Sequence, residues 1–211
     1  GEAPSDIAAG AGSLRRHALI LDAPDNAMDI VGTGGDGTGT YNISTATALV
    51  LAGAGIPVAK HGNKAVSSKS GAADVLTALG INLDCPEEAL SKALKVAKIV
   101  FLMAPRHHSA MRHVGPIRAE LGVRTIFNLL GPLSNPALVR RIMVGVFDAR
   151  WLQPFAEALR TLGTTDAFIV HGADGLDELS TTGSNQITML KDGQILETTL
   201  HPSDLSLPTA R

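Results

Sequence analysis

A glycine-rich run at positions 32–40, with the sequence GTGGDGTGT, is the stretch best suited to chemistry. Glycine tolerates positive φ and lets a ligand approach the backbone amides closely. Successive amide N–H groups form a cradle for an anion, and the free N–H groups of a following helix add to its field. Polar side chains follow at Thr40, Asn42, Ser44 and Thr45. This pattern indicates phosphate binding.

The same run also fits the dinucleotide fingerprint Gly-x-Gly-x-x-Gly through Gly32, Gly34 and Gly37. A dinucleotide site needs a helix that starts within the glycines and an acidic residue about 20 positions later. Here the loop continues past the glycines, and the later position holds Lys60. Asp36 suits a phosphate only if a metal ion shares the site. The context favours a magnesium-assisted pyrophosphate, with a ligand-free glycine turn as a further alternative.

A second polar loop is expected at residues 60–71, between a strand and a helix. It holds three lysines and three serines, which supply charge and donors for phosphate oxygens. In an open parallel sheet, loops that follow strands emerge at the same edge, where ligands bind. The alternative for this loop alone is a solvated surface segment with a helix cap at Ser70.

Hydrophobic periodicity predicts an α/β fold with a largely parallel central sheet flanked by helices. The expected strands are 28–31, 56–59, 99–104, 141–147 and 166–170, followed by a hairpin at 187–198 that turns at Asp192-Gly193. The expected helices are 7–21, 44–54, 70–79, one that starts at Pro86, 108–121 and 149–162. Residues 125–136, rich in Gly, Pro and Asn, are expected to form a loop.

Composition excludes several functional classes. The chain has 211 residues, a net charge of −2 and a pI of about 6.4, so no basic field favours nucleic acid as a partner. Its apolar stretch at 46–59 is too short for a membrane span. The single cysteine, Cys85, fits a reducing cytoplasm. We therefore expect a cytoplasmic protein that acts on small molecules, without nucleic acid or membrane as partner.

Several ordered motifs together resemble the anthranilate phosphoribosyltransferase family. They are GTGGD at 32–36, NIST at 42–45, KHGN at 60–63, SGAADVL at 70–76, FNLLGPLSNP at 127–136, and HG with GLDE at 171–178. The resemblance extends from residue 7 to residue 208. It implies that residues 1–22 are a remnant of a small N-terminal all-α domain. Residues 23–211 would be the catalytic α/β domain, shortened at its C-terminus, and a homodimer would require the complete helical domain.

The resemblance implies a reaction in which anthranilate displaces pyrophosphate from phosphoribosyl pyrophosphate, a step of tryptophan biosynthesis. It implies Mg²⁺ as cofactor, two ions with the pyrophosphate substrate, held by Ser44, Asp177 and Glu178. It implies anthranilate contacts at Gly32, His61, Asn63 and Arg118. Contacts to phosphoribosyl pyrophosphate are implied at Gly32, Gly35, Asp36, Thr40, Asn42, Ser44, Thr45, Lys60, Gly62, Asn63, Lys64, Ser67 and Ser68. Ala72 departs from the family pattern, which has a serine there.

The chemistry of these residue types agrees with the implied roles. Adjacent Asp177 and Glu178 in a glycine-containing loop are hard oxygen ligands that suit Mg²⁺, although an acidic pair in a loop is more often simply solvated. The planar fork of Arg118 matches a carboxylate such as that of anthranilate, although most helix arginines lie at the surface. His61, His107 and His108 are candidate proton acceptors. Hydrogen bonding or packing is the commoner role for each, because a neutral aromatic amine needs no strong base.

Two rival functions remain at the level of sequence. A pyrimidine nucleoside phosphorylase shares the fold type and a lysine-serine phosphate loop, but the motif at 127–136 and the first glycine loop favour the transferase. A non-catalytic paralogue that binds nucleic acid is disfavoured by the low pI and by the intact Asp177-Glu178 pair.

Overall fold

The computed structural model describes residues 1–34, 37, 39–63 and 71–210, and its centre is one seven-stranded sheet. The strand order is β3-β2-β1-β4-β5-β6-β7. Strands β1 to β5 run parallel, and β6 and β7 are antiparallel additions at one edge. The strands are β1 (Met28–Gly32), β2 (Val58–Gly62), β3 (Ile99–Met103), β4 (Arg141–Gly145), β5 (Asp166–His171), β6 (Asn185–Lys191) and β7 (Gln194–Leu200). The predicted α/β class is confirmed.

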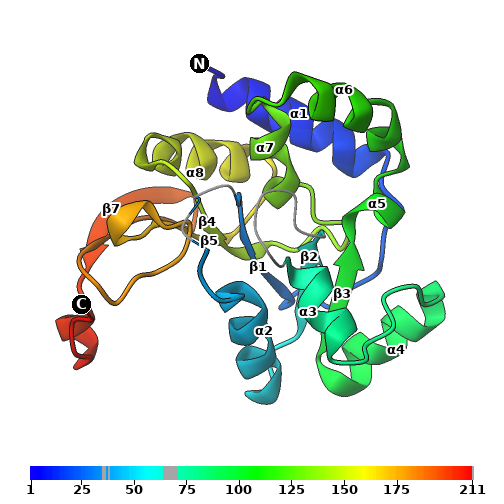
Figure 1. Ribbon diagram of the computed structural model, residues 1–211, viewed down its shortest axis with the longest axis horizontal. Helices are drawn as coiled ribbons and strands as arrows, with labels where there is room; N and C mark the ends of the chain where they lie inside the picture. The colour runs from blue at the N-terminus through cyan, green and yellow to red at the C-terminus, as the bar shows by residue number, and fades with distance from the viewer. Residues whose placement is uncertain (35–36, 38, 64–70, 211) are drawn as a thin grey trace.

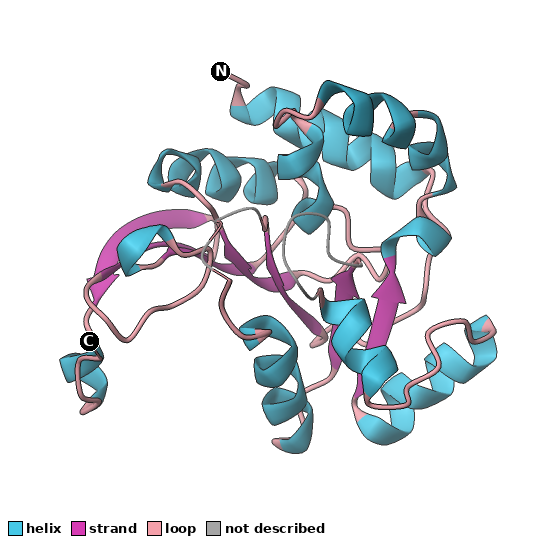
Figure 2. Cartoon of the chain, viewed as in Figure 1, coloured by secondary structure: helices cyan, strands magenta, loops and turns pink. Residues whose placement is uncertain are grey.

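Helices lie on both sides of this sheet (Figure 1). The α-helices are α1 (Pro4–Arg16), α2 (Ile43–Gly53), α3 (Ala72–Ala78), α4 (Glu87–Ala97), α5 (Ala104–His107), α6 (Gly115–Leu121), α7 (Phe127–Leu130) and α8 (Leu152–Thr161). Short 3₁₀ turns are η1 (Ser109–His113), η2 (Gly131–Leu133), η3 (Ala149–Trp151), η4 (Ala173–Gly175) and η5 (Pro202–Leu205). Figure 2 shows α2 and α3 on one side of the strands, and α1, α7 and α8 on the other.

The main core forms where α1, α7 and α8 cover β4, β5 and β6. Phe155 of α8 and Ile7 of α1 are fully buried there, against Val144 and Ile169 of the sheet. Arg15 extends α1 into this packing, because its Nε donates to the carbonyl of Leu133 at 2.8 Å. The first helix therefore shares its hydrophobic core with the sheet.

The strand order reverses at β1, which lies between β2 and β4. The chain runs from β1 outward to β2 and β3, then returns to the other side of β1 as β4. In open α/β sheets, ligands bind at the carboxyl ends of the strands where the order reverses in this way. A ligand site is therefore expected at the carboxyl ends of β1, β2, β4 and β5.

The sequence locates most elements but misplaces several boundaries. The helix expected at 7–21 ends at Arg16, and Leu21 is buried in a separate cluster after the helix. The strand expected at 56–59 covers Val58–Gly62 instead, so Lys60 and His61 belong to β2 rather than to a loop. Both residues are buried, but their polar side chains break the apolar pattern by which a buried strand is predicted from sequence.

Two further expectations about helices are corrected. The helix expected at 108–121 is divided into η1 and α6, which meet at Val114 before Gly115-Pro116. The loop expected at 125–136 contains α7 and η2, which the Gly and Pro content conceals. The hairpin is confirmed, and Asp192 and Gly193 at its turn have φ of 51° and 76°. This φ pair suits the tight turn that joins twisted antiparallel strands. In the part of the chain that the structure describes, no helix has the length and apolarity to cross a bilayer.

Candidate functional site

The connection between β5 and β6 folds back over the carboxyl ends of β1, β4 and β5. Three glycines make this approach possible. A Cβ on Gly32 would overlap the side chain of Asp177, and a Cβ on Gly145 would overlap its backbone carbonyl. A Cβ on Gly172 would overlap the carbonyl of Glu178. The Asp177-Glu178 pair is therefore seated directly on the strand ends, where a ligand is expected.

The first glycine loop meets this acidic pair. The backbone N–H of Gly34, which has φ of +69°, donates to Oδ2 of Asp177 at 2.6 Å. Asp177 itself is only 8% exposed. Residues 143 positions apart in sequence are thus joined, and the loop expected to hold phosphate lies beside the carboxylates expected to hold metal.

Lys60 reaches the same region from the middle of β2. Its side chain is 3% exposed, and Nζ donates to the carbonyl of Ile30 and, at 3.1 Å, to Oγ of Ser44. Burial lowers the pKa of Lys60, while the charges of Asp29 and Glu178 oppose that change. A cation this deeply buried needs opposite charges and hydrogen-bond acceptors around it, and Asp29 and Glu178 supply the charges while Ile30 and Ser44 supply the acceptors.

A layer of buried imidazoles lies on the other face of β2. The rings of His61 and His108 meet edge to face, with centroids 5.1 Å apart, and Nδ1 of His107 lies 2.6 Å from the carbonyl of Leu19. The pKa of His61 is lowered to about 3, chiefly by burial and in part by the neighbouring His108 and His107. Burial also lowers the pKa values of His107 and His108. These rings are neutral at pH 7, so they can donate or accept single hydrogen bonds but carry no charge.

Beneath His61, a buried carboxylate and a buried amide are hydrogen-bonded. Asp29 is 0% exposed, and its Oδ2 accepts from Nδ2 of Asn135 at 2.7 Å. Burial raises the pKa of Asp29 to about 6, against the opposing effects of Lys60 and these hydrogen bonds. The sequence motif at 127–136 thus contains a residue, Asn135, that is hydrogen-bonded to β1 and β2 at the centre of the sheet.

The structure brings a subset of the predicted ligand residues together: Gly32, Ser44, Lys60, Asp177 and Glu178. Thr45 is buried at the start of α2, and among the described residues its hydroxyl has no hydrogen-bond partner. Thr40 is exposed, and Asn42 occupies the N-cap of α2 without a side-chain capping bond.

Other predicted residues have different neighbours. Gly62 ends β2, where a Cβ would come within 2.9 Å of the Phe101 ring. Asn63 is exposed, and its carbonyl accepts from Ala73. Arg118 lies on α6 with its guanidinium 5.5 Å from the centre of the Phe127 ring, and its contact with a carboxylate ligand stays a prediction. The remaining predictions, at Gly35, Asp36, Lys64, Ser67 and Ser68, fall outside the described residues.

Sequence reasoning misses four residues that shape the site. Gly145 and Gly172 lie at the ends of β4 and β5, and a glycine that closes a predicted strand is the available signal. Asp29 and Asn135 lie inside recognised segments, but a lone acidic residue within a strand carries no sign of its partner. Their pairing emerges only from the three-dimensional contact.

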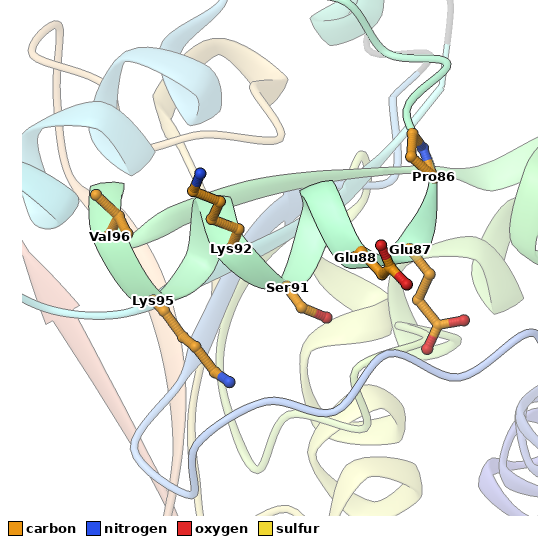
Figure 3. A pocket seen from close by; sticks show the side chains of 7 residues that line it. All are labelled: Pro86, Glu87, Glu88, Ser91, Lys92, Lys95 and Val96. Atoms are coloured by element: carbon orange, nitrogen blue, oxygen red, sulfur yellow. The ribbon is translucent and has the colours of Figure 1, made fainter.

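A surface hollow runs along α4 (Figure 3). It is lined by Pro86, Glu87, Glu88, Ser91, Lys92, Lys95 and Val96. All seven residues belong to one helix and its N-cap, and none is predicted to touch a ligand. The hollow therefore contributes nothing to the site at the strand ends.

Known proteins resemble this chain in sequence. The model of a family described as "Glycosyl transferase family, a/b domain" matches residues 24–211. A protein of Parvibaculum lavamentivorans named anthranilate phosphoribosyltransferase is 58% identical over 210 residues, which cover 100% of this chain and 62% of that protein. A relative of the same name from Rhizobium meliloti is 56% identical, with 98% and 61% covered. The chain thus spans about three fifths of the length of these relatives.

Solved structures agree with the fold. The anthranilate phosphoribosyltransferase of Thermus thermophilus superposes with a TM-score of 0.93 at 48% identity, over 100% of this chain and 63% of that one. The Saccharomyces cerevisiae enzyme, solved in complex with phosphoribosyl pyrophosphate (PRPP) and Mg, superposes with a TM-score of 0.89 at 35% identity, over 99% and 58% of the two chains.

Proposed function

Because this chain belongs to the glycosyl transferase family defined by its α/β domain, we propose that it transfers the phosphoribosyl group of PRPP to the amino nitrogen of anthranilate. The observation that carries the proposal is the seating of Asp177 and Glu178 on the strand ends, beside the Gly34 amide and the buried Lys60. The names of the relatives and the bound molecules of the yeast structure support it. Products are N-(5-phosphoribosyl)anthranilate and pyrophosphate.

The reaction requires little proton chemistry from the protein. The neutral amine of anthranilate forms the new C–N bond at the anomeric carbon, and the C–O bond to pyrophosphate breaks with its electron pair going to the leaving oxygen. The amine then loses one proton to solvent water. In this proposal Lys60 and the amides of the glycine loop stabilise negative charge on the leaving group, which is usually the largest contribution that a site of this kind makes. Neutral His61 lies on the opposite face of β2, and its proposed role is to contact anthranilate.

The donor set suits Mg²⁺. Two adjacent carboxylates and the Ser44 hydroxyl offer hard oxygens, and Mg²⁺ is usually bound by one or two carboxylates together with substrate phosphates. Among the described residues, no group of three or more His, Cys, Asp or Glu could hold an ion by itself. This is the arrangement expected if the substrate completes the coordination. Bound Mg²⁺ would neutralise charge on the pyrophosphate, and Ser44, Asp177 and Glu178 would hold it. Two ions, a homodimer and a cytoplasmic location belong to the same proposal.

Loss of anthranilate fluorescence after addition of PRPP and Mg²⁺ tests this function. Asp177→Ala combined with Glu178→Ala is expected to abolish the Mg²⁺-dependent turnover. Glu87→Ala combined with Glu88→Ala removes an adjacent acidic pair from α4 and is the matched control. Unchanged turnover in the first double variant would refute the metal assignment. Phosphate-dependent cleavage of thymidine, without consumption of anthranilate, would instead favour the pyrimidine nucleoside phosphorylase.

A further inference from the structure

The backbone ladder between strands β1 and β2 registers only Met28 with Val58, whereas β2 pairs with β3 over five positions and β1 pairs with β4 over five. Beyond Val58 this ladder therefore has a gap, in which N–H and C=O groups on the β1 side of β2 have no registered partner on β1. Buried backbone groups of this kind need other hydrogen-bond partners.

Asp29 and Asn135 supply those partners. Oδ1 of Asp29 accepts from the backbone N–H of His61 at 3.1 Å, and Nδ2 of Asn135 donates to the carbonyl of Ala59 at 2.7 Å. The two side chains also bond to each other at 2.7 Å, and Oδ1 of Asn135 accepts from the N–H of Ala137. Both residues are at most 1% exposed. Side chains thus replace the missing rungs of the ladder on either side of Lys60.

Lys60 spans the same gap from the opposite face of the sheet. Residues alternate faces along a strand, so Lys60 points away from the face shared by Ala59 and His61. Its Nζ donates to the carbonyl of Ile30, the residue after Asp29 on β1. A shift of β2 relative to β1 would therefore move Lys60 and His61 together, one toward each side of the sheet.

A contribution to folding stability does not by itself explain why the Asp29 carboxylate is buried. Well-packed apolar residues of similar volume often serve a fold as well as a buried polar network, because removing charge from water is costly. A fully hydrogen-bonded polar network instead selects one arrangement of the groups around it. Here the Asp29–Asn135 network selects one separation of β1 and β2 at their carboxyl ends, where the proposed ligand site lies.

We propose that Asp29 and Asn135 are positioning residues, which set the separation of β1 and β2 and thereby place Lys60 and His61 in the ligand site. The positioning requires neither side chain to touch a ligand. The identity of the two substrates rests on the proposed function, with Lys60 acting toward PRPP and His61 toward anthranilate. The positioning itself rests on the hydrogen bonds among the described residues.

Two near-isosteric changes test the pair. Asp29→Asn turns an amide toward the amide of Asn135, and Asn135→Asp turns a carboxylate toward Asp29 and the Ala59 carbonyl. Each is expected to raise KM for both substrates about tenfold or more, because a misplaced Lys60 charge or His61 ring weakens substrate binding. The double variant exchanges the two groups, so that the amide at position 29 can donate to the carboxylate at position 135. It is therefore expected to recover part of the lost substrate affinity. Phe155→Leu, in the core under α8, is the control that lowers melting temperature without altering the gap.

A spectroscopic measurement makes the result independent of activity. With ¹⁵N-labelled histidine, the amide proton of His61 is expected to move upfield in Asp29→Asn, because its charged acceptor is lost. Variants that lower kcat only in proportion to lost folded protein, with KM and the His61 amide unchanged, would overturn the proposal. If Asp29→Asn does not fold, Asn135→Ser removes the bond to Ala59 and is measured in the same way. If the unsubstituted protein lacks turnover, the proposed function is refuted. The chemical shift of the His61 amide in the variants then still tests whether Asp29 and Asn135 position β2.

Discussion

At the scale of single residues, the glycines under the acidic pair are the positions least able to change. Gly145→Ala would drive a methyl group into the backbone of Asp177, which flexible side-chain movement cannot relieve. We expect a loss of at least about tenfold in the proposed Mg²⁺-dependent turnover, since a small misplacement of groups that act on a substrate costs this much or more. Gly53→Ala is the matched control, because a Cβ there meets nothing within 4 Å and alanine favours the helix by up to about 1 kcal/mol. Equal activities for the two variants would contradict the expectation.

The buried imidazole of His61 predicts a pH dependence of folding stability. Its pKa is about 3 in the folded chain, against 6.5 for an unperturbed histidine, so the unfolded chain binds the proton between these two values. The free energy of unfolding therefore falls as pH falls below 6.5, by about 2 kcal/mol from this residue between about pH 7.5 and pH 5. Asp29, with a pKa raised to about 6, acts in the opposite direction between about pH 4 and pH 6.

Denaturant titrations at several pH values measure this effect. His61→Gln is expected to flatten the decline of stability between about pH 7.5 and pH 5 relative to the unsubstituted chain. His113→Gln, which removes an exposed imidazole, is the control for losing a histidine at the surface. An unaltered slope in His61→Gln would mean that the ring is already protonated or accessible in the folded state.

At the scale of elements, the sequence predicts what hydrophobic periodicity controls. Strands such as β3 and β5 are located within one residue, because each contains a short apolar run, IVFLM in β3 and AFIV in β5. Strand β2 is shifted, because Lys60 and His61 are polar residues buried by tertiary contacts that the local sequence does not encode. The glycine loop and the Asp177-Glu178 pair are recognisable as motifs. The Asp29–Asn135 contact joins residues 106 positions apart and is not predictable from either segment.

One face of the sheet carries an uncovered apolar row. Met143, Phe168, Met189 and Leu196 are cross-strand neighbours on β4 to β7, and Phe168 and Leu196 are about half exposed. Aligned exposed apolar side chains of this kind bind other apolar surfaces. We expect Phe168→Thr to reduce binding of the dye ANS by the folded chain, while Val96→Thr, at an exposed site on α4, leaves it unchanged. Equal reductions would assign dye binding to another surface.

At the scale of the whole molecule, the position of α1 bears on domain organisation. The division into residues 1–22 and 23–211 stays a prediction. Ile7 is fully buried with Leu129 and Phe155, so α1 and the α/β part are expected to unfold as one cooperative unit. Ile7→Ala is expected to cost about 2–5 kcal/mol and to lower the single melting transition of the whole chain. Two separate transitions, with only the first affected, would contradict this expectation. Glu2→Ala near the N-terminal end is the control.

The hydrogen bond between Gly34 and Asp177 has a consequence for the order of folding. It closes a loop of 143 residues and can form only after β1, β4 and β5 are paired, since the acidic pair rests on their ends. Contacts between residues so distant in sequence form late, because the entropy of closing the loop is lost before the contact contributes. A nascent chain would thus complete the proposed ligand site only when nearly all of its strands are in register. Completion of this site is therefore a kinetic marker for completed folding.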